Sequence, residues 1–238
     1  MSLAKLHRAW HELTPSWVSD AADGHRILAA HSSWLLTIDS RYREPQRFYH
    51  TTDHIARLLE LCDEFAPRIR DRRAVMLAVV FHDIIYDPQA SDNEDKSISL
   101  YLKYAASIET PVNESDKVVK FIKATESHNI PETYKAELDA AALNDLEYFL
   151  DFDLEVLSWK PEDYDRYAIQ IRNEYIHLPD EVFRSDRITV LRKLLTKSDR
   201  LYYTAEFRSG EEGREERGKK NLEREMAQLE QGDGGDSM

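Results

Sequence analysis

The amino-acid sequence predicts an all-α fold. Apolar residues recur at helical spacing through most of the chain, and the 8 prolines fall between these apolar segments. Only 7 residues are glycine, fewer than a sandwich or barrel with many tight turns needs. Because proline is common at helix edges and disfavoured in helix interiors, this pattern indicates a series of short helices.

Apolar periodicity locates the predicted helices along the chain. One follows residue 53, and the run 74–85 is nearly all apolar, as expected for a helix buried on most sides. A parallel strand is the competing interpretation of this run, but it is long for a strand and no alternation of strands and helices surrounds it. Further helices are expected around 100–104 and 118–122, and over 138–157 and 188–201.

The C-terminal segment 209–238 differs in composition from the rest of the chain. It is rich in charged residues, carries a thin apolar face at Leu222, Met226 and Leu229, and ends in GDGGDSM. This pattern predicts a charged helix followed by a flexible end. We therefore predict one helical domain over residues 1–208 and a charged helical tail over 209–238.

Composition limits the classes of function. The formal net charge is −13 at pH 7, and the basic footprint of a nucleic-acid-binding protein is not visible. The acidity leaves room for a cation site, although solubility alone is its simplest explanation. A phosphate substrate would need a local metal or arginine field to overcome the overall repulsion.

The single cysteine and the lack of long apolar segments predict a cytoplasmic protein. Cys62 excludes a disulfide within the chain and a thiolate zinc knuckle, and its apolar neighbours predict a core position. No stretch approaches the roughly 20 apolar residues of a membrane span, and the N-terminus lacks a long apolar signal segment. We expect no membrane association, and the sequence indicates no oligomeric state.

A histidine and an aspartate stand side by side inside the apolar run, at His82 and Asp83. Buried charge is costly unless it is paired or bound to a metal, so this pair needs an explanation. Adjacent helical residues point about 100° apart, yet both side chains can reach one ion beside the helix. A structural hydrogen bond between the two is the alternative, and the dipeptide alone does not exclude it.

Two other segments carry side chains of the same chemical types. His50 and His54 are four residues apart, which places them on one face if a single helix includes both. Residues 51–53 are good N-cap residues, so the helix can instead begin there and leave His50 outside it. Downstream, Asp153 lies within the apolar pattern of 138–157, where an exposed or capping aspartate is the alternative interpretation.

These segments together resemble the HD superfamily of metal-dependent phosphohydrolases, and within it the branch of predicted phosphohydrolases. The matching motifs are YHTTDHI at 49–55, FHDIIYD at 81–87, NEDKS at 93–97 and DFDL at 151–154. They occur in the family's order, and the likeness runs from about residue 42 to about residue 222. Several linked motifs are far more specific than one, and they imply an HD-domain helical bundle.

The resemblance implies one divalent metal site, formed by His54, His82, Asp83 and Asp153. Asp151 is an alternative to Asp153, but related motifs place the ligand directly before leucine or arginine, which favours Asp153. Imidazole and carboxylate ligands suit Mn, Mg, Fe, Co, Ni or Zn, and the lack of cysteine ligands disfavours a structural zinc.

The resemblance also suggests roles around the metal. Cyclic-nucleotide phosphodiesterases share the Tyr-His-x-x-x-His arrangement, in which the first histidine protonates the leaving oxygen and the second binds metal. His50 is therefore the expected general acid, although Thr51 stands where those enzymes and many relatives have asparagine. Asp87 and Glu94 are candidates to orient or deprotonate water.

Other side chains are candidates for substrate or for a second metal. Phosphate oxygens are expected to meet Arg47, Lys96 or Arg172, each of which can equally be a solvated surface charge. His128 is a candidate ligand for a second metal, with a histidine at a helix C-terminus as the alternative. His177 is a less plausible candidate.

We expect hydrolysis of a phosphoester or phosphoanhydride in a small phosphorylated, nucleotide-like substrate. An HD-type di-iron oxygenase is one alternative, which would need ligands beyond the four above. The other is a regulatory module that binds nucleotide or metal without turnover, against which the intact ligand set speaks. The identity of the substrate and of the native metal is not indicated by the sequence.

Overall fold

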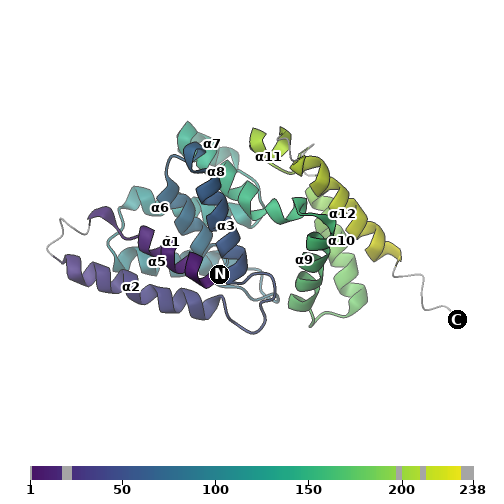
Figure 1. Ribbon diagram of the computed structural model, residues 1–238, viewed down its shortest axis with the longest axis horizontal. Coiled ribbons are helices and arrows are strands. Elements are labelled where there is room, and N and C mark those ends of the chain that lie inside the picture. Colours follow the sequence, from purple (N-terminus) through teal and green to yellow (C-terminus); the bar gives the residue numbers. More distant parts are fainter. Residues whose placement is uncertain (1, 18–22, 197–199, 210–212, 232–238) are drawn as a thin grey trace. The chain divides into compact units, whose positions relative to one another are not determined.

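The computed structural model describes residues 2–17, 23–196, 200–209 and 213–231. Within this part of the chain the fold is all-α, with twelve α-helices, short 3₁₀ helices and no strand (Figure 1). The predicted fold class is therefore confirmed. The chain divides into two compact units, Met1–Phe149 and Leu150–Met238.

The first unit is organised around one buried helix, α4, whose residues from Ala74 to Phe81 are all buried because all of them are apolar. Helices α3, α5 and α6 pack against it, and α1 packs against α3. The elements of this unit are α1 (Ser2–Glu12), α2 (Gly24–Arg41), α3 (Thr52–Glu64), η2 (Ala66–Arg68), α4 (Arg72–Phe81), α5 (Asn93–Ser107), α6 (Val112–Thr125), α7 (Glu132–Glu137) and most of α8 (Ala140–Asp153).

Helix α4 is shorter than its apolar run predicts. It ends at Phe81 with His82 as its C-cap, whereas a helix continuing to Ile85 was expected. The pair His82 and Asp83 consequently lies at the end of the helix and in the turn that follows. This corrects the prediction that the pair lies inside a buried helix.

Hydrogen bonds from a distant segment explain why α4 stops. The carbonyl oxygens of Asp83 and Ile84 accept from the guanidinium of Arg47, at 2.8 and 3.1 Å. In a continued helix, Ile84 would need the backbone N–H four residues later, but that residue is Pro88, which has none. Both the proline and the arginine therefore favour a turn over another turn of helix.

A buried histidine joins α1 and α2 in the first unit. The ring of His31 stacks on Trp10, with centroids 4.4 Å apart, and its Nε2 lies 2.9 Å from the carbonyl oxygen of Trp10. Its Nδ1 lies 3.0 Å from the hydroxyl of Tyr104. Burial lowers the pKa of His31, and the charges of Arg73 and His11 lower it further. The neutral imidazole is thus part of the packing of this unit.

We expect stability to fall as pH drops below about 6.5, the ordinary pKa of histidine. The pKa of His31 is lower in the folded protein, so the unfolded chain takes up the proton first as pH decreases. The contribution is fully present above the unfolded pKa and is lost as pH falls towards the folded one. Urea unfolding at pH 7.5 and 5.5 measures it, and His31→Gln, which does not titrate, should show a smaller difference. An equal difference in both proteins would contradict this role.

The second unit contains the end of α8 followed by η3 (Glu155–Ser158), α9 (Pro161–Glu174), α10 (Asp180–Thr196), α11 (Ala205–Ser209) and α12 (Arg214–Gln231). Helix α12 packs on η3 and α10, and it occupies the segment where a charged helix was predicted (Figure 1). Its buried Glu225 forms a paired contact with Arg187, at 2.7 and 3.1 Å, and accepts the hydroxyl of Tyr164. Polar as well as apolar side chains therefore hold α12.

The flexible end predicted after α12 falls on 232–238, outside the described residues, and a domain boundary at 208 remains a prediction. The helices predicted over 138–157 and 188–201 are present with shifted ends, as α8 followed by η3 and as the C-terminal part of α10.

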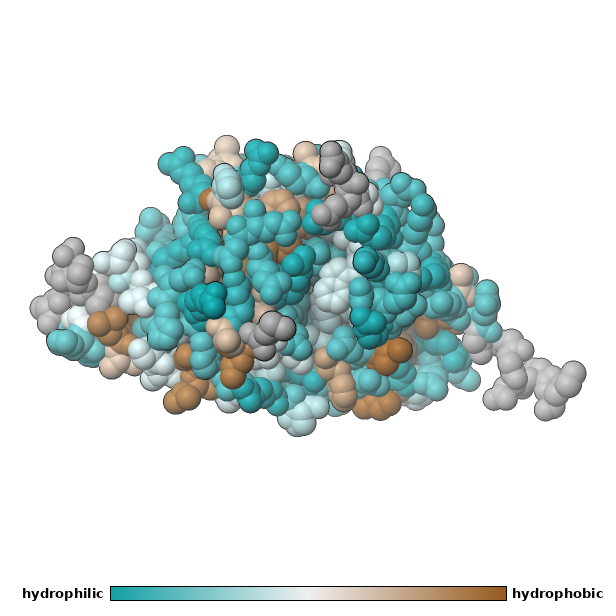
Figure 2. All heavy atoms as spheres, viewed as in Figure 1, coloured by the Kyte–Doolittle hydropathy of each residue, from teal (hydrophilic) through white to brown (hydrophobic). Residues whose placement is uncertain are grey.

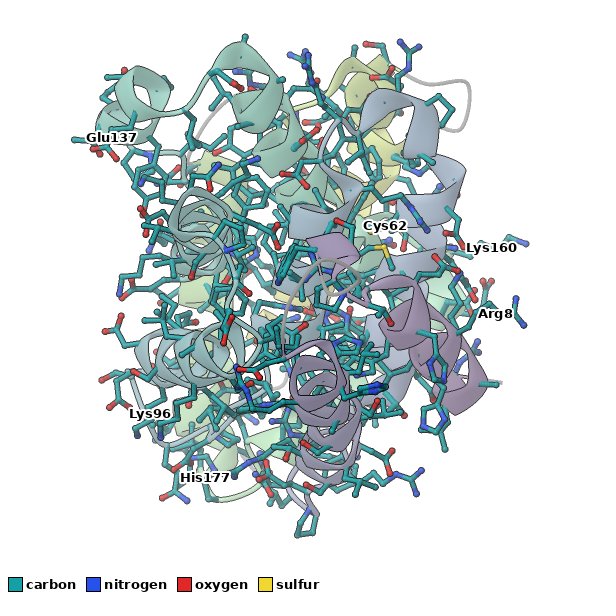
Figure 3. The ribbon with its side chains drawn as sticks, turned by 90° about the vertical axis from the view of Figure 1, so that its left-hand side faces the viewer. Arg8, Cys62, Lys96, Glu137, Lys160 and His177 are labelled. Carbon is teal, nitrogen blue, oxygen red and sulfur yellow. The ribbon has the colours of Figure 1, made fainter. Side chains whose placement is uncertain are left out.

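The exposed faces are mostly polar. Figure 2 shows that hydrophilic side chains cover most of the displayed face, with apolar side chains in separate small patches. None of the described helices is both long enough and apolar enough to cross a membrane. Cys62 is fully buried, as predicted, and burial raises the pKa of its thiol to about 12 (Figure 3).

Candidate metal centre

The backbone at the end of α4 fixes the orientation of His82. The Nδ1 atom of this buried histidine lies 3.0 Å from the carbonyl oxygen of Val79. In the neutral imidazole, Nδ1–H donates to that carbonyl, which leaves the lone pair of Nε2 available to a cation. Metal-binding histidines commonly use a backbone carbonyl in this way to set their tautomer.

His54 is positioned by the start of α3. The hydroxyl of Thr51 caps this helix by accepting from the N–H of Asp53, so α3 begins at Thr52. The helix start among residues 51–53 that the sequence allowed is therefore confirmed, and His50 lies just outside the helix. His54 is buried, and its Nε2 lies 3.3 Å from Nε2 of His82.

The four predicted ligands come together in the structure. His54, His82, Asp83 and Asp153 each offer one ligand atom, and these atoms all lie within 4.8 Å of one another. Oδ2 of Asp83 lies 3.0 Å from Nε2 of His82 and 3.7 Å from Nε2 of His54. Atoms bound to one ion at about 2.0–2.2 Å lie roughly 3–4 Å from each other, so the spacing suits a shared cation.

The donor set also fits a divalent metal chemically. Two imidazoles and two carboxylates are borderline and hard donors, and together they suit the divalent metals named above. The two carboxylates balance the charge of such an ion. Both histidines are buried and both aspartates are partly buried, so the group is largely withdrawn from water.

The alternative aspartate has a different role. Asp151 is fully buried, and its carboxylate accepts from the N–H of Tyr203 and from the N–H and hydroxyl of Thr204, each at 2.7 Å. It therefore holds the segment that precedes α11. Asp153 is the last residue of α8, and it is the aspartate found in the group that could hold a metal ion.

We expect Asp151→Asn to impair mainly stability and Asp153→Asn to impair mainly metal binding. The first leaves buried donors without a good acceptor, which should lower the free energy of unfolding by about 1–3 kcal/mol with little change in metal affinity. The second should weaken metal binding with a smaller cost in stability. Urea unfolding of the metal-free proteins and metal titration of the folded proteins separate the two effects. Loss of metal binding by a fully folded Asp151→Asn protein would contradict the assignment.

The proposed acid, His50, lies beside the group and is not a member of it. Its Nε2 lies 3.9 Å from Oδ2 of Asp83, and its ring stacks on Tyr86 with centroids 4.3 Å apart. The side chain is 20% exposed, unlike the enclosed imidazole of His54. A partly exposed imidazole next to the ligands is suited to meet a substrate.

The two acidic candidates differ in their surroundings. Glu94, in the first turn of α5, has its pKa raised by burial, and the charges of Asp83 and Glu126 raise it further. Asp87 is exposed, and its Oδ1 accepts from the N–H of Gln89 at 2.9 Å. Glu94 therefore shares an electrostatic environment with the candidate ligand Asp83, whereas the contact of Asp87 is that of a turn residue.

The three candidate phosphate-binding cations are not equivalent. The side chain of Arg47 is fully enclosed and donates to backbone carbonyls. Lys96 is at the surface of α5, 51% exposed, and pairs with Asp92 at 2.7 Å (Figure 3). Arg172 belongs to the second unit, where it pairs with Asp180. Of the three, Lys96 has the most accessible charge.

Neither His128 nor His177, the two histidines considered for a second metal, belongs to the four-residue group. His128 lies in the turn that follows α6, three residues after its last residue, Thr125, and has a positive φ of 51°. This matches the alternative of a histidine at a helix C-terminus. His177 is exposed in the second unit, and its ring lies 5.9 Å from that of Tyr175.

Comparisons with known proteins add no family. No protein-family model matches the chain, and no curated protein or solved structure shows significant similarity to it. The likeness to the HD superfamily therefore depends on the sequence motifs and on the residues that they bring together.

Proposed function

We propose that this protein is a metal-dependent phosphohydrolase of the HD type. Its substrate would be a small nucleotide-like molecule in which a phosphoester or phosphoanhydride bond is cleaved. The observation that carries the proposal is the meeting of His54, His82, Asp83 and Asp153, whose ligand atoms lie within 4.8 Å of one another. These residues come from three separate motifs, and the motifs occur in the order that the HD superfamily uses.

The group would hold one divalent cation through two imidazole nitrogens and two carboxylate oxygens. Such an ion supplies a Lewis acid that lowers the pKa of water and neutralises charge on the phosphoryl group. The protein supplies the orientation: Val79 holds the imidazole of His82, and the start of α3 presents His54. Ligands fixed in advance need little reorganisation when charge develops.

The residues around the group would move the protons. His50 is partly exposed and lies next to Asp83, so in its protonated form it can give a proton to the leaving oxygen. Glu94 has a raised pKa, which makes its carboxylate a stronger base, and it can take up the proton of an attacking water. Lys96 offers an accessible positive charge for phosphate oxygens.

Metal analysis joined to a hydrolysis screen tests the proposal. Purified protein should contain a tightly bound divalent metal and should release phosphate from some nucleotides, cyclic nucleotides or sugar phosphates. A chelator should abolish this activity, and one of the metals named above should restore it. Bound iron with oxygen consumption would instead support an oxygenase, and binding of metal and nucleotide without turnover would support a regulatory module.

A further inference from the structure

The segment just before α3, residues 42–50, holds the turn that carries Asp83. The hydroxyl of Tyr42 donates to the carbonyl oxygen of Val80 at 2.9 Å, and the amide of Gln46 donates to that of Tyr86 at 3.0 Å. Together with the bonds from Arg47 and the stacking of His50 on Tyr86, these contacts run from the last turn of α4 through the following turn. We call residues 42–50 the clasp.

Arg47 is the centre of the clasp. Its guanidinium donates to the carbonyl oxygens of His50, Asp83 and Ile84, at 2.9, 2.8 and 3.1 Å, and Nε pairs with Glu44 at 3.3 Å. The side chain has no exposed surface. A buried guanidinium is costly unless its donors are satisfied, and these contacts satisfy most of them, three with backbone oxygens and one with the carboxylate of Glu44. A phosphate would have to displace these bonds to reach it.

One nitrogen atom of Arg47 links two functional segments. Nη1 donates both to the carbonyl of His50 and to the carbonyl of Asp83. The backbone of the candidate acid is thereby tied to the backbone of a candidate ligand, although the two residues are far apart in the sequence. Because a side chain can be no better placed than its own backbone, this link sets the positions of both.

We propose that Arg47 is a positioning residue, which fixes the turn of Asp83 and the backbone of His50 in one arrangement without touching ion or substrate. The effect on turnover rests on the proposed function, whereas the effect on metal affinity rests only on the candidate metal site within it. Outer contacts that orient metal ligands are commonly worth 10–100-fold in affinity. This role differs from the phosphate binding that the sequence suggested for Arg47.

Lysine cannot replace arginine in this role. The planar guanidinium reaches several carbonyls at fixed angles and lies near two aromatic rings, 5.0 Å from the centroid of Tyr42 and 5.4 Å from that of Tyr86. A lysine ammonium keeps the positive charge but lacks the planar set of N–H donors that lets arginine bind several carbonyl oxygens at once. Arg47→Lys therefore tests geometry rather than charge. Arg43 provides a matched control in the same segment, because it is 55% exposed and pairs only at the surface with Asp39, at 2.8 Å.

The experiment is a Co²⁺ titration of the full chain after removal of metal, followed by calorimetry, with circular dichroism to monitor folding. Arg47→Lys should bind Co²⁺ about 10–100-fold more weakly than the wild type, and Arg43→Lys should bind normally. Wild-type affinity in folded Arg47→Lys protein would overturn the inference. If the wild type itself binds no Co²⁺, the proposed function fails instead.

Two further measurements keep the test decisive. If Arg47→Lys does not fold, Arg47→Gln, whose amide can still donate to two carbonyls, takes its place, and unfolding of both variants would overturn the inference in favour of a purely structural role. With an active substrate, a positioning role predicts a lower kcat together with weaker Co²⁺ binding. A higher KM with normal Co²⁺ affinity would instead restore Arg47 as a phosphate-binding residue.

Discussion

Replacing His82 or Asp83 with alanine is expected to abolish metal binding while leaving most of the helical structure intact. His82 lies at the C-terminal end of α4, and Asp83 lies in the turn after it, so neither supports the interior of the helix. Each substitution removes one candidate ligand from the four-residue group. We expect metal affinity to fall by at least 100-fold, beyond the range usual for an outer contact. Metal analysis after gel filtration and circular dichroism are the measurements.

A matched control uses a histidine outside the group. His128→Ala removes an imidazole that follows α6, and it should leave metal content unchanged. His82→Ala also removes a buried ring that contacts Phe149, with centroids 5.7 Å apart, so some loss of thermal stability is expected in that variant. Full metal occupancy in folded His82→Ala protein would show that His82 and Asp83 form only a structural pair.

The fold class could be predicted from the sequence because it depends on local patterns. Prolines between apolar segments and the capping residue Thr51 act over a few residues, and they are visible without any knowledge of tertiary structure. The grouping of the four candidate ligands could be predicted because the resemblance concerns residue types in a fixed order. The structure brings His54, His82, Asp83 and Asp153 together in agreement with that order.

What the sequence could not show depends on contacts between distant segments. The end of α4 depends on donors from Arg47 as well as on Pro88. The proline is visible in the sequence, but nothing in the run 74–85 indicates that an arginine far upstream will bind its carbonyl oxygens. The same holds for Asp151, because only the fold shows that residues 203–204 donate to its carboxylate. Local periodicity treats both aspartates of the DFDL motif alike, whereas tertiary contacts separate them.

The surroundings of the three candidate phosphate-binding residues were the hardest feature to predict from the sequence. Arg47, Lys96 and Arg172 look alike in the sequence, yet one is enclosed, one is exposed and one belongs to the second unit. A local signal for Arg47 was nevertheless present, because Glu44 and Tyr42 precede it closely in the sequence and both are its partners in the structure. The contact with Tyr86 joins distant segments and has no such local signal.

His50→Ala should keep the metal and lose most of the turnover. His50 is outside the four-residue group, so its removal leaves every ligand in place. General acid catalysis is typically worth about 10²–10⁴-fold, and we expect kcat to fall within that range. Equal metal content in the variant and the wild type, measured on the same preparations used for kinetics, is required before the loss of turnover is interpreted.

The leaving group distinguishes acid catalysis by His50 from mere positioning. An alkoxide is a strong base and needs a proton as its bond to phosphorus breaks, whereas p-nitrophenolate is stable enough to leave without one. His50→Ala should therefore slow the hydrolysis of alkyl esters much more than the hydrolysis of p-nitrophenyl esters. If His50 only positioned the substrate, the hydrolysis of both ester classes would slow equally, because both contain the same phosphoryl group. Equal losses on the two leaving groups, or loss of metal from the variant, would make His50 a structural residue or a ligand. A selective loss on alkyl esters would place the proton of His50 at the leaving oxygen.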